Sequence, residues 1–537
     1  MLSTKSMELR EHGRERGRVG PVRAGPREIE LLPDNTEKYM ATKTENNWNG
    51  NTGIPGCIRK MSRYERLFLM SPACTVMMAA RITGTVDEAR FRQALDAASR
   101  KHPLLSAKII FDRRHEAWFS SDAVPLVPLR VVPRVSEHQW LDELKGEARV
   151  PFDLAGGPLI KCVLLQSPEV SDLIIFCNHS ICDGMALAGL VRDLLSLYED
   201  PAQEVRALEP PDVANLQKGP GLSLQVLVAR LFAAFANRKW MKNPYYFGPA
   251  EYAALYRAYW EGRKPGLVLF EFDPEESARL LAVCRGHGVT VGSALAAACL
   301  AAHNDIAGGF SQKQQALMVP YDMRRRAKPV EDVFCFCAGG LQFPLTYSPE
   351  KQFWDNAAAL HRAIHTRLEN PDPSEAYVPD FEPSLIDALS AFSLFVDRVP
   401  GAYARTEVLQ RFIRDTGNMV FSFNRNYERD IPGFVPSNLG KVDIPESSDG
   451  IRLDRLVFLP SASELNPLVL GGIGAGGRTI FSLPFVDPPA KTGISPEPEM
   501  IRIRNRALEY LGFPEKVHPG ATEMQTLCGT RAGTHEG

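Results

Sequence analysis

The sequence predicts an α/β protein built in two similar halves. Apolar, partly β-branched runs alternate with amphipathic helical segments in both halves. Proline- and glycine-rich stretches at 209–212 and 219–221 interrupt that alternation near the middle. The chain has 537 residues, of which 44% are hydrophobic, so it is long enough to bury two cores. We place an N-terminal half at residues 59–215 and a C-terminal half at residues 216–515.

The two ends of the chain lack this alternation. Residues 1–58 and 516–537 mix polar residues, Gly and Pro without periodicity, and such segments cannot offset the entropy cost of ordering. We expect both to be disordered tails. No secretory signal is evident, and no apolar run reaches the about 18 residues that span a bilayer. We therefore expect a cytoplasmic protein.

Composition also limits the partners. The 62 basic residues nearly balance 64 acidic ones, so no overall field would hold the protein on nucleic acid. The ten cysteines include no CxxC pair and no zinc-type spacing. We expect reduced, mostly buried thiols and no metal, and we interpret Cys335-Phe336-Cys337 as two core cysteines on a strand.

The pattern of the first half predicts a strand, a helix, a hairpin, a second helix and two further strands. The expected ranges are 74–82, 86–100, 106–120, 138–149, 158–166 and 173–178. The last two strands are nearly continuous in apolar residues, so we expect them inside a sheet that is covered on both faces.

The second half repeats this style. We expect strands at 267–272, 316–320, 339–346, 417–423 and 453–458, helices at 274–288 and 290–302, and a hairpin at 472–484. The helix at 290–302 is so rich in small residues that it must pack closely against a neighbour. Residues 472–477 fit GxGxxG, but a strand follows them rather than a helix, so we predict a hairpin loop and not a phosphate site.

One segment, Phe176 to Gly184, carries a pattern suited to catalysis. An apolar strand ends at His179, a turn follows, and an apolar helix begins near Met185. We expect Gly184 to supply a backbone conformation that other residues disfavour. A neutral imidazole at a strand end can accept a proton from an alcohol or amine, because its ordinary pKa is about 6.5. Asp183 is expected to brace the turn or to pair with an arginine.

The spacing His-x-x-x-Asp is weak evidence by itself. His138 and Asp142 have the same spacing inside a predicted surface helix. The alternative for His179 is a hydrogen-bonded histidine in the core. What separates His179 from His138 is its context, with an apolar strand before it and a glycine and an apolar helix after Asp183.

The motif Asn178-His179-Ser180-Ile181-Cys182-Asp183-Gly184 resembles the HHxxxDG signature of condensation domains and the HxxxD signature of related acyltransferases. Four flanking segments match in the same order, and the resemblance spans about residues 61–490. These segments are 101–105, 152–159, 289–295 and 437–440. Asn178 replaces the first His, as in single-His acyltransferases. The DFGWG motif of plant acyltransferases and the GxSxG motif of serine esterases are both absent.

The resemblance implies two chloramphenicol-acetyltransferase-like α/β sandwich subdomains with mixed sheets around a central tunnel. It implies a general base at His179, an ion pair between Asp183 and Arg324, and oxyanion or tunnel groups at Ser437 or Asn438. For Arg324 the alternative is one member of the solvated basic run 324–326. For Ser437 and Asn438 it is an ordinary turn.

The function implied is transfer of an acyl group from acyl-CoA or an acyl carrier protein to a hydroxyl or amine, with no bound cofactor and no metal. The acceptor is expected to be a small or lipid-like molecule, and the protein a monomer. Two alternatives remain open. One is a carrier-dependent condensation enzyme that forms an amide, and the other is a catalytically silent binding protein.

The segment 222–242 is apolar almost all round, and Arg238, Lys239, Trp240 and Lys242 close it. One interpretation is an interfacial helix that contacts a membrane surface. Its place at the expected boundary favours the other interpretation, a helix buried between the two halves.

Overall fold

The computed structural model describes residues 54–212, 224–324, 332–345, 347–369, 380–395, 398–415, 417–427, 432–444, 450–489 and 493–516. From Pro55 onward, the described residues belong to one compact unit. The expected boundary at 215/216 lies outside the described residues, as do most of both expected tails. Strand β1 (Cys57–Lys60) begins within the stretch expected to be tail, because it pairs with β4 (Ala117–Ser120).

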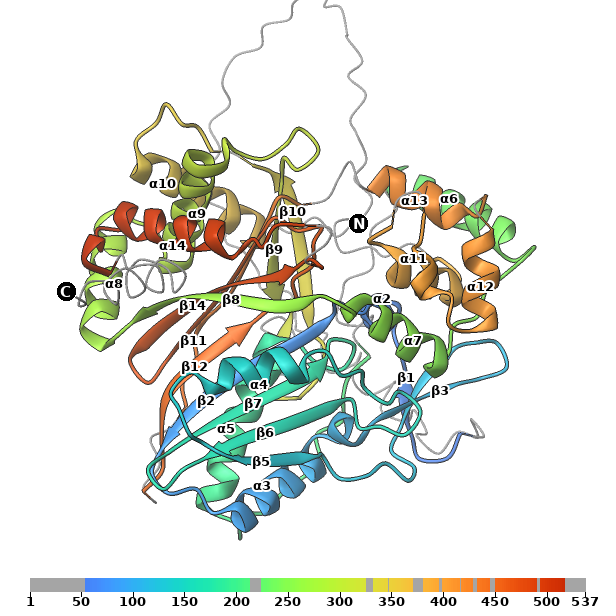
Figure 1. The fold of residues 1–537 in the computed structure, drawn as a ribbon, viewed down its shortest axis with the longest axis horizontal. Helices are drawn as coiled ribbons and strands as arrows, with labels where there is room; N and C mark the ends of the chain where they lie inside the picture. The colour runs from blue at the N-terminus through green and yellow to red at the C-terminus, as the bar shows by residue number, and fades with distance from the viewer. Residues whose placement is uncertain are drawn as a thin grey trace, which may run out of the picture. The chain divides into compact units, whose positions relative to one another are not determined.

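The first large sheet has five strands in the order β12-β2-β7-β6-β5. Their bounds are β2 (Thr75–Thr83), β5 (Leu129–Pro133), β6 (Ile160–Gln166), β7 (Val170–Asn178) and β12 (Arg452–Leu459). Strands β5 and β6 are parallel and the other neighbours are antiparallel, so the sheet is mixed. Strand β12 comes from the second half of the sequence and lies beside β2 (Figure 1).

Three helices from the first half accompany this sheet: α3 (Glu88–Lys101), α4 (Gln139–Glu147) and α5 (Gly184–Glu199). Helices α3 and α5 pack against each other, and α5 also contacts β2. Strand β7 is buried over nearly its whole length. The hairpin expected at 106–120 is present as β3 (Lys108–Phe111) and β4, which form a small sheet with β1.

The second large sheet has six strands in the order β10-β9-β11-β13-β14-β8. Their bounds are β8 (Lys264–Phe272), β9 (Ala316–Asp322), β10 (Ala338–Pro344), β11 (Phe434–Lys441), β13 (Leu468–Ala475) and β14 (Arg478–Asp487). Strand β11 is parallel to β9 and β13, and the other pairs are antiparallel. Two mixed sheets confirm the predicted α/β class.

Helices cover the second sheet at the left of Figure 1. They are α8 (Pro274–Gly286), α9 (Val291–Ala307), α10 (Phe353–Glu369) and α14 (Glu497–Tyr510). The small-residue helix α9 packs against α10, α14 and β11, as expected from its lack of bulk. The GxGxxG stretch joins β13 to β14 as a hairpin, and Gly476 and Gly477 both have the positive φ that its turn requires. This confirms the predicted hairpin.

A cluster of helices occupies the right side of Figure 1. It contains α2 (Arg63–Leu69), α6 (Leu224–Trp240), α7 (Pro249–Trp260), α11 (Pro383–Phe392), α12 (Glu407–Arg414) and α13 (Met419–Tyr427). The strand predicted at 417–423 is wrong, because these residues lie largely in α13. Val420, Phe421 and Asn424 are buried at helical spacing, and the Asn424 amide donates to the carbonyls of Phe392 and Phe395.

Within the described residues, no single helix is long and apolar enough to cross a membrane. The pair formed by α8 and α9 meets the length and composition together but is bent by 87°.

Candidate active site

His179 lies directly after β7, in a turn fixed by backbone contacts. Its N–H donates to the Cys74 carbonyl (3.1 Å), just before β2 begins. The side-chain oxygen of Asn178 accepts from the Ser180 N–H (3.0 Å), and the Ile181 N–H donates to the Asn178 carbonyl (3.1 Å). Asn178, which stands where condensation domains have their first His, therefore holds the turn that carries His179.

The His179 ring is held in one tautomer. Its Nδ1 lies 2.7 Å from the Cys182 carbonyl oxygen. A carbonyl can only accept, so Nδ1 carries the hydrogen and Nε2 keeps its lone pair. Burial lowers the pKa of His179 below its ordinary value, against the opposing effects of the Cys182 carbonyl and the Asp183 charge. The imidazole is therefore neutral near pH 7, with Nε2 ready to accept a proton.

Two aromatic rings flank this imidazole. The Phe68 ring centroid lies 4.3 Å from that of His179, and the Phe336 centroid lies 5.4 Å away in a T-shaped contact. The two phenyl rings also touch, at 5.0 Å. They come from α2 and from the segment before β10, far from His179 in sequence. Their contacts fix the ring plane, and no spacing in the sequence signals them.

Asp183 caps α5 and gathers donors from distant segments. Its Oδ1 accepts from the Ala186 N–H (2.9 Å) at the helix start. Its Oδ2 accepts from the Cys337 N–H (2.7 Å) and lies 2.8 Å from Arg324 Nη1. The carboxylate thus braces the turn that carries His179.

Arg324 follows β9 and is 4% exposed, so it is not part of a solvated run; Arg325 and Arg326 lie outside the described residues. Burial alone would lower its pKa, but the charge of Asp183 raises it well above the ordinary value. Asp322 also accepts from Arg324 Nη1 (3.1 Å). The guanidinium therefore stays charged, and the pair with Asp183 is an ion pair shielded from water.

The segment 332–337 closes this arrangement. The Cys335 carbonyl accepts from Arg324 Nη2, and the Cys335 and Cys337 sulfur atoms lie 3.1 Å apart as free thiols. These cysteines are buried as predicted, but they precede β10 instead of lying on it. The Cys335 carbonyl and the Cys337 N–H bind Arg324 and Asp183, and so do not join a β-ladder.

Gly184 is required for a different reason from the one predicted. It is the first residue of α5 and is absent from the glycines with positive φ, so the expectation of an unusual backbone conformation is wrong. A Cβ at this position would lie 2.6 Å from Phe458 and 2.8 Å from Leu439. Close packing of α5 against β12 and β11 therefore leaves no room for a side chain here unless Phe458 and Leu439 shift.

Ser437 and Asn438 lie in β11, not in a loop, because β11 pairs with β13. Neighbouring strand residues face opposite sides of a sheet. Ser437 shares a face with Leu439, which packs beside the position of Gly184. Asn438 is turned toward α9, where a Cβ on Gly292 would meet its amide at 2.2 Å. The two side chains therefore face opposite sides of the sheet, and an oxyanion or tunnel role for Ser437 or for Asn438 stays a prediction.

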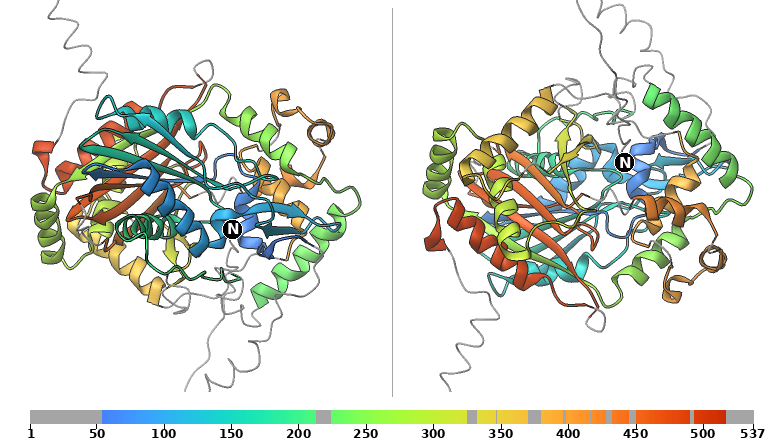
Figure 2. Two further views of the ribbon diagram at one scale, coloured as in Figure 1. Left: turned by 90° about the horizontal axis from the view of Figure 1, so that it is seen from below. Right: turned by 90° about the horizontal axis from the view of Figure 1, so that it is seen from above.

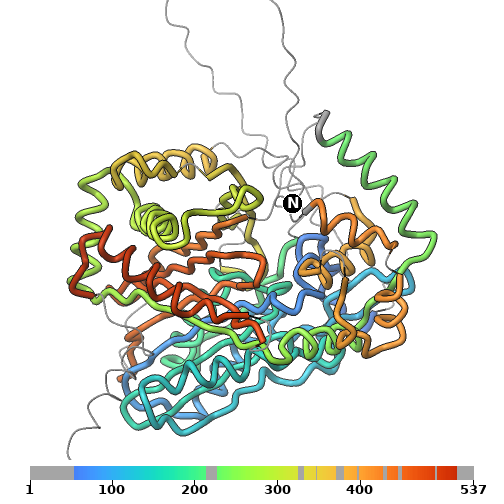
Figure 3. Tube along the Cα trace, turned by 45° about the horizontal axis from the view of Figure 1, so that its top comes forward, coloured from blue at the N-terminus to red at the C-terminus, as the bar shows by residue number. Residues whose placement is uncertain are grey.

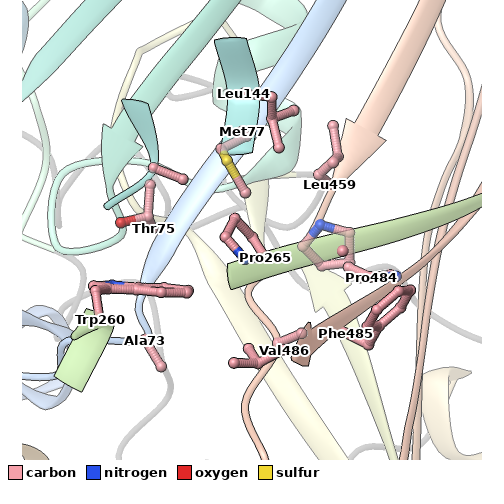
Figure 4. A pocket seen from close by; sticks show the side chains of 14 residues that line it. Ala73, Thr75, Met77, Leu144, Trp260, Pro265, Leu459, Pro484, Phe485 and Val486 are labelled. Atoms are coloured by element: carbon pink, nitrogen blue, oxygen red, sulfur yellow. The ribbon is translucent and has the colours of Figure 1, made fainter. Parts of the chain in front are cut away.

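A small apolar cavity lies between the two large sheets (Figure 4). Met77 from β2, Pro265 from β8 and Phe485 from β14 line it, and Trp260 closes one side. Its volume is about 30 Å³, and His179 is not among its lining residues. This cavity is not the implied tunnel, which stays a prediction. Among the described residues, no group of three or more His, Cys, Asp or Glu is placed to hold a metal ion.

Solved structures with this fold cover most of the chain. Polyketide synthase associated protein 5 from Mycobacterium tuberculosis is 15% identical, with a TM-score of 0.53 over 87% of this chain and 100% of that one. The first condensation domain of the CDA synthetase is 14% identical, with a TM-score of 0.52 over 86% of this chain and 97% of that one. TRI3 trichothecene 15-O-acetyltransferase from Fusarium sporotrichioides is 13% identical, with a TM-score of 0.53 over 84% of this chain and 94% of that one. These likenesses show the fold.

Curated relatives match shorter segments. The nonribosomal peptide synthetase ataP of Aspergillus terreus is 28% identical over 169 residues, which are 31% of this chain and 9% of the relative. The phosphinothricin tripeptide synthetase PhsC of Streptomyces viridochromogenes is 30% identical over 147 residues, which are 26% of this chain and 13% of the relative. No family model matches. The chain therefore has the fold of condensation domains and chloramphenicol-acetyltransferase-like acyltransferases, and segments of its sequence match peptide synthetases.

Proposed function

We propose that the protein transfers an acyl group from a thioester, either acyl-CoA or an acyl carrier protein, to a hydroxyl or amine acceptor. The observation that carries this proposal is the state of His179. Its Nδ1–H is committed to the Cys182 carbonyl, and burial keeps the ring neutral, so Nε2 is an available base at a strand end.

In the proposed reaction a single histidine both removes the proton and returns it. Nε2 of His179 takes the proton from the acceptor O–H or N–H as the acceptor atom attacks the thioester carbonyl carbon. The tetrahedral intermediate then collapses, the C–S bond breaks, and the imidazolium returns the proton to the thiolate. Asp183 acts as a positioning residue, because its contacts go to Arg324, Cys337 and the start of α5.

A second candidate, a condensation enzyme that forms an amide between carrier-bound substrates, is favoured by the matches to peptide synthetases. The same base would serve an amine acceptor. The two candidates differ in their donor and acceptor, and so in which thioesters support turnover.

The test is a screen of acyl-CoA chain lengths and acyl carrier proteins against alcohols and amines, read by release of free thiol and by mass of the product. Acceptor-dependent thiol release together with an ester or amide product supports the proposal. Ester formation from acyl-CoA separates the first candidate from the second. Binding of a thioester without any turnover would support the silent binding protein instead.

A further inference from the structure

Helix α6 has one face that packs on the protein and one that does not. On the inner face, Ala233, Ala236 and Trp240 are buried, and the Trp240 indole N–H donates to Ser384 Oγ of α11 (2.8 Å). The Asn237 amide donates to the Asp380 carbonyl (2.7 Å). These contacts anchor α6 to the segment around α11, so Trp240 is not available to a membrane.

The outer face of α6 is apolar and solvent-exposed. Leu227, Val228, Leu231 and Phe235 are 53%, 53%, 64% and 67% exposed. Their spacing puts them on one stripe of the helix, opposite Ala233 and Trp240. Figures 2 and 3 show α6 at the edge of the fold, with other helices on only one side of it. The expectation of a helix buried between the two halves is therefore wrong, because this stripe has no covering element among the described residues.

Basic residues complete this stripe. Arg238, Lys239 and Lys242 are exposed and continue the outer face at the C-terminal end of α6, and Arg230 lies at its edge. Residues 222–242 contain no Asp or Glu. The nearby Asp380 carboxylate is paired with Arg63 (2.9 Å). The outer face is thus apolar over three turns and positively charged beyond them.

We propose that this face of α6 docks the protein on an anionic phospholipid surface. An apolar stripe with basic residues and no acidic ones matches both layers of such a surface, because the apolar side chains enter the acyl boundary while the cations meet the headgroups. A purely apolar protein partner would give the basic end no counterpart. The inference is independent of the chemistry at His179.

Flotation of the full chain with liposomes tests the proposal. Wild type is expected to float with vesicles that contain phosphatidylglycerol and to bind phosphatidylcholine vesicles on the order of 100-fold less tightly, since each exposed cation near an anionic surface contributes about fivefold. Leu231→Glu/Phe235→Glu should abolish flotation. Arg238→Glu/Lys239→Glu should remove the preference for anionic vesicles.

The matched control is Leu126→Glu/Val135→Glu, which also places two glutamates at exposed apolar positions but away from α6 (67% and 81% exposed). It should float like wild type. All three double variants should keep the wild-type melting temperature, because all six side chains are exposed. Wild type that stays at the bottom with anionic vesicles overturns the proposal. So does a Leu231→Glu/Phe235→Glu variant that floats normally, or one whose only change is from dimer to monomer in sedimentation.

Discussion

The chain contains the spacing His-x-x-x-Asp twice, and the two copies have very different surroundings. His138 is exposed at the start of α4 and makes no capping hydrogen bond with its side chain, and Asp142 is exposed in the first turn. His179 stands at the end of a buried strand with its Nδ1 bound to the Cys182 carbonyl. Asp183 is buried against Arg324. The difference shows that the spacing does not make the site.

The candidate site forms because segments distant in the sequence pack around His179 and Asp183. Arg324 follows a strand of the second sheet, and the Cys337 N–H comes from the segment before another. A neutral, oriented base therefore depends on contacts between the two sheets, which a local pattern cannot supply. Substitutions at the site, with counterparts at His138, Asp142 and Gly189, and a pH profile sharpen this contrast.

The largest expected effect is on turnover. His179→Ala should lower the rate of acyl transfer 10²- to 10⁴-fold, because it removes proton transfer in the transition state, while the melting temperature changes little. His138→Ala should leave the rate of thiol release unchanged. Equal activities of the two variants in that assay would contradict the role of His179.

The next effect is on stability. Arg324→Met or Asp183→Asn leaves one buried charge without its partner, so each should lower the free energy of unfolding by about 3 to 5 kcal/mol. Asp142→Asn removes an exposed carboxylate and should change the free energy of unfolding by less than about 0.5 kcal/mol. Urea unfolding followed by circular dichroism measures all three. An Asp183→Asn protein as stable as Asp142→Asn would show that Asp183 braces nothing.

A smaller contrast lies within α5. Gly184→Ala places a methyl group against Phe458 and Leu439 and should cost about 1 to 3 kcal/mol of stability and reduce activity. Gly189→Ala meets nothing within 4 Å and should stabilise the protein by about 0.5 to 1 kcal/mol, because alanine is the better helix former. Thermal unfolding compares the two, and equal shifts would contradict the close packing at Gly184.

The smallest expected effect is a shift of the acid limb of the pH–activity profile to lower pH. In the proposed reaction the neutral form of His179 is the base, and burial lowers the pKa of this histidine. Activity should therefore persist below pH 6.5 and fall only through the lowered pKa of this histidine. The measurement is kcat/KM against pH with an active thioester. A fall that begins above pH 7 would mean that His179 is not the neutral base described.

The sequence predicts His179 and Asp183 because their signals are local, an apolar strand run before the histidine and an apolar helix after the aspartate. Arg324 could be predicted only through the resemblance, since nothing around it specifies a partner. Phe68 and Phe336 could not be predicted, because tertiary packing alone brings them to the ring. The same holds for the reason behind Gly184, which lies in Phe458 and Leu439.

The fold likewise contains elements that the sequence predicts and elements that depend on tertiary contacts. Strands of the first half and the β13–β14 hairpin follow from period and turn residues. The strand prediction at 417–423 is wrong because an apolar run with Val and Phe suits a strand, whereas burial of Val420, Phe421 and Asn424 at helical spacing decides for a helix. Strand β12 belongs to the first large sheet because it pairs with β2, and no feature of the β12 sequence predicts that pairing.

The most direct test of the central claim needs no substrate. Nitrogen-15 NMR of histidine-labelled protein, with the His179→Gln variant used to assign the signal, reports which ring nitrogen carries the hydrogen. At pH 7.5 the account predicts a neutral His179 ring with hydrogen on Nδ1 and an unprotonated Nε2, and protonation only below pH 6.5. A ring with hydrogen on Nε2, or an imidazolium at pH 7.5, would contradict it.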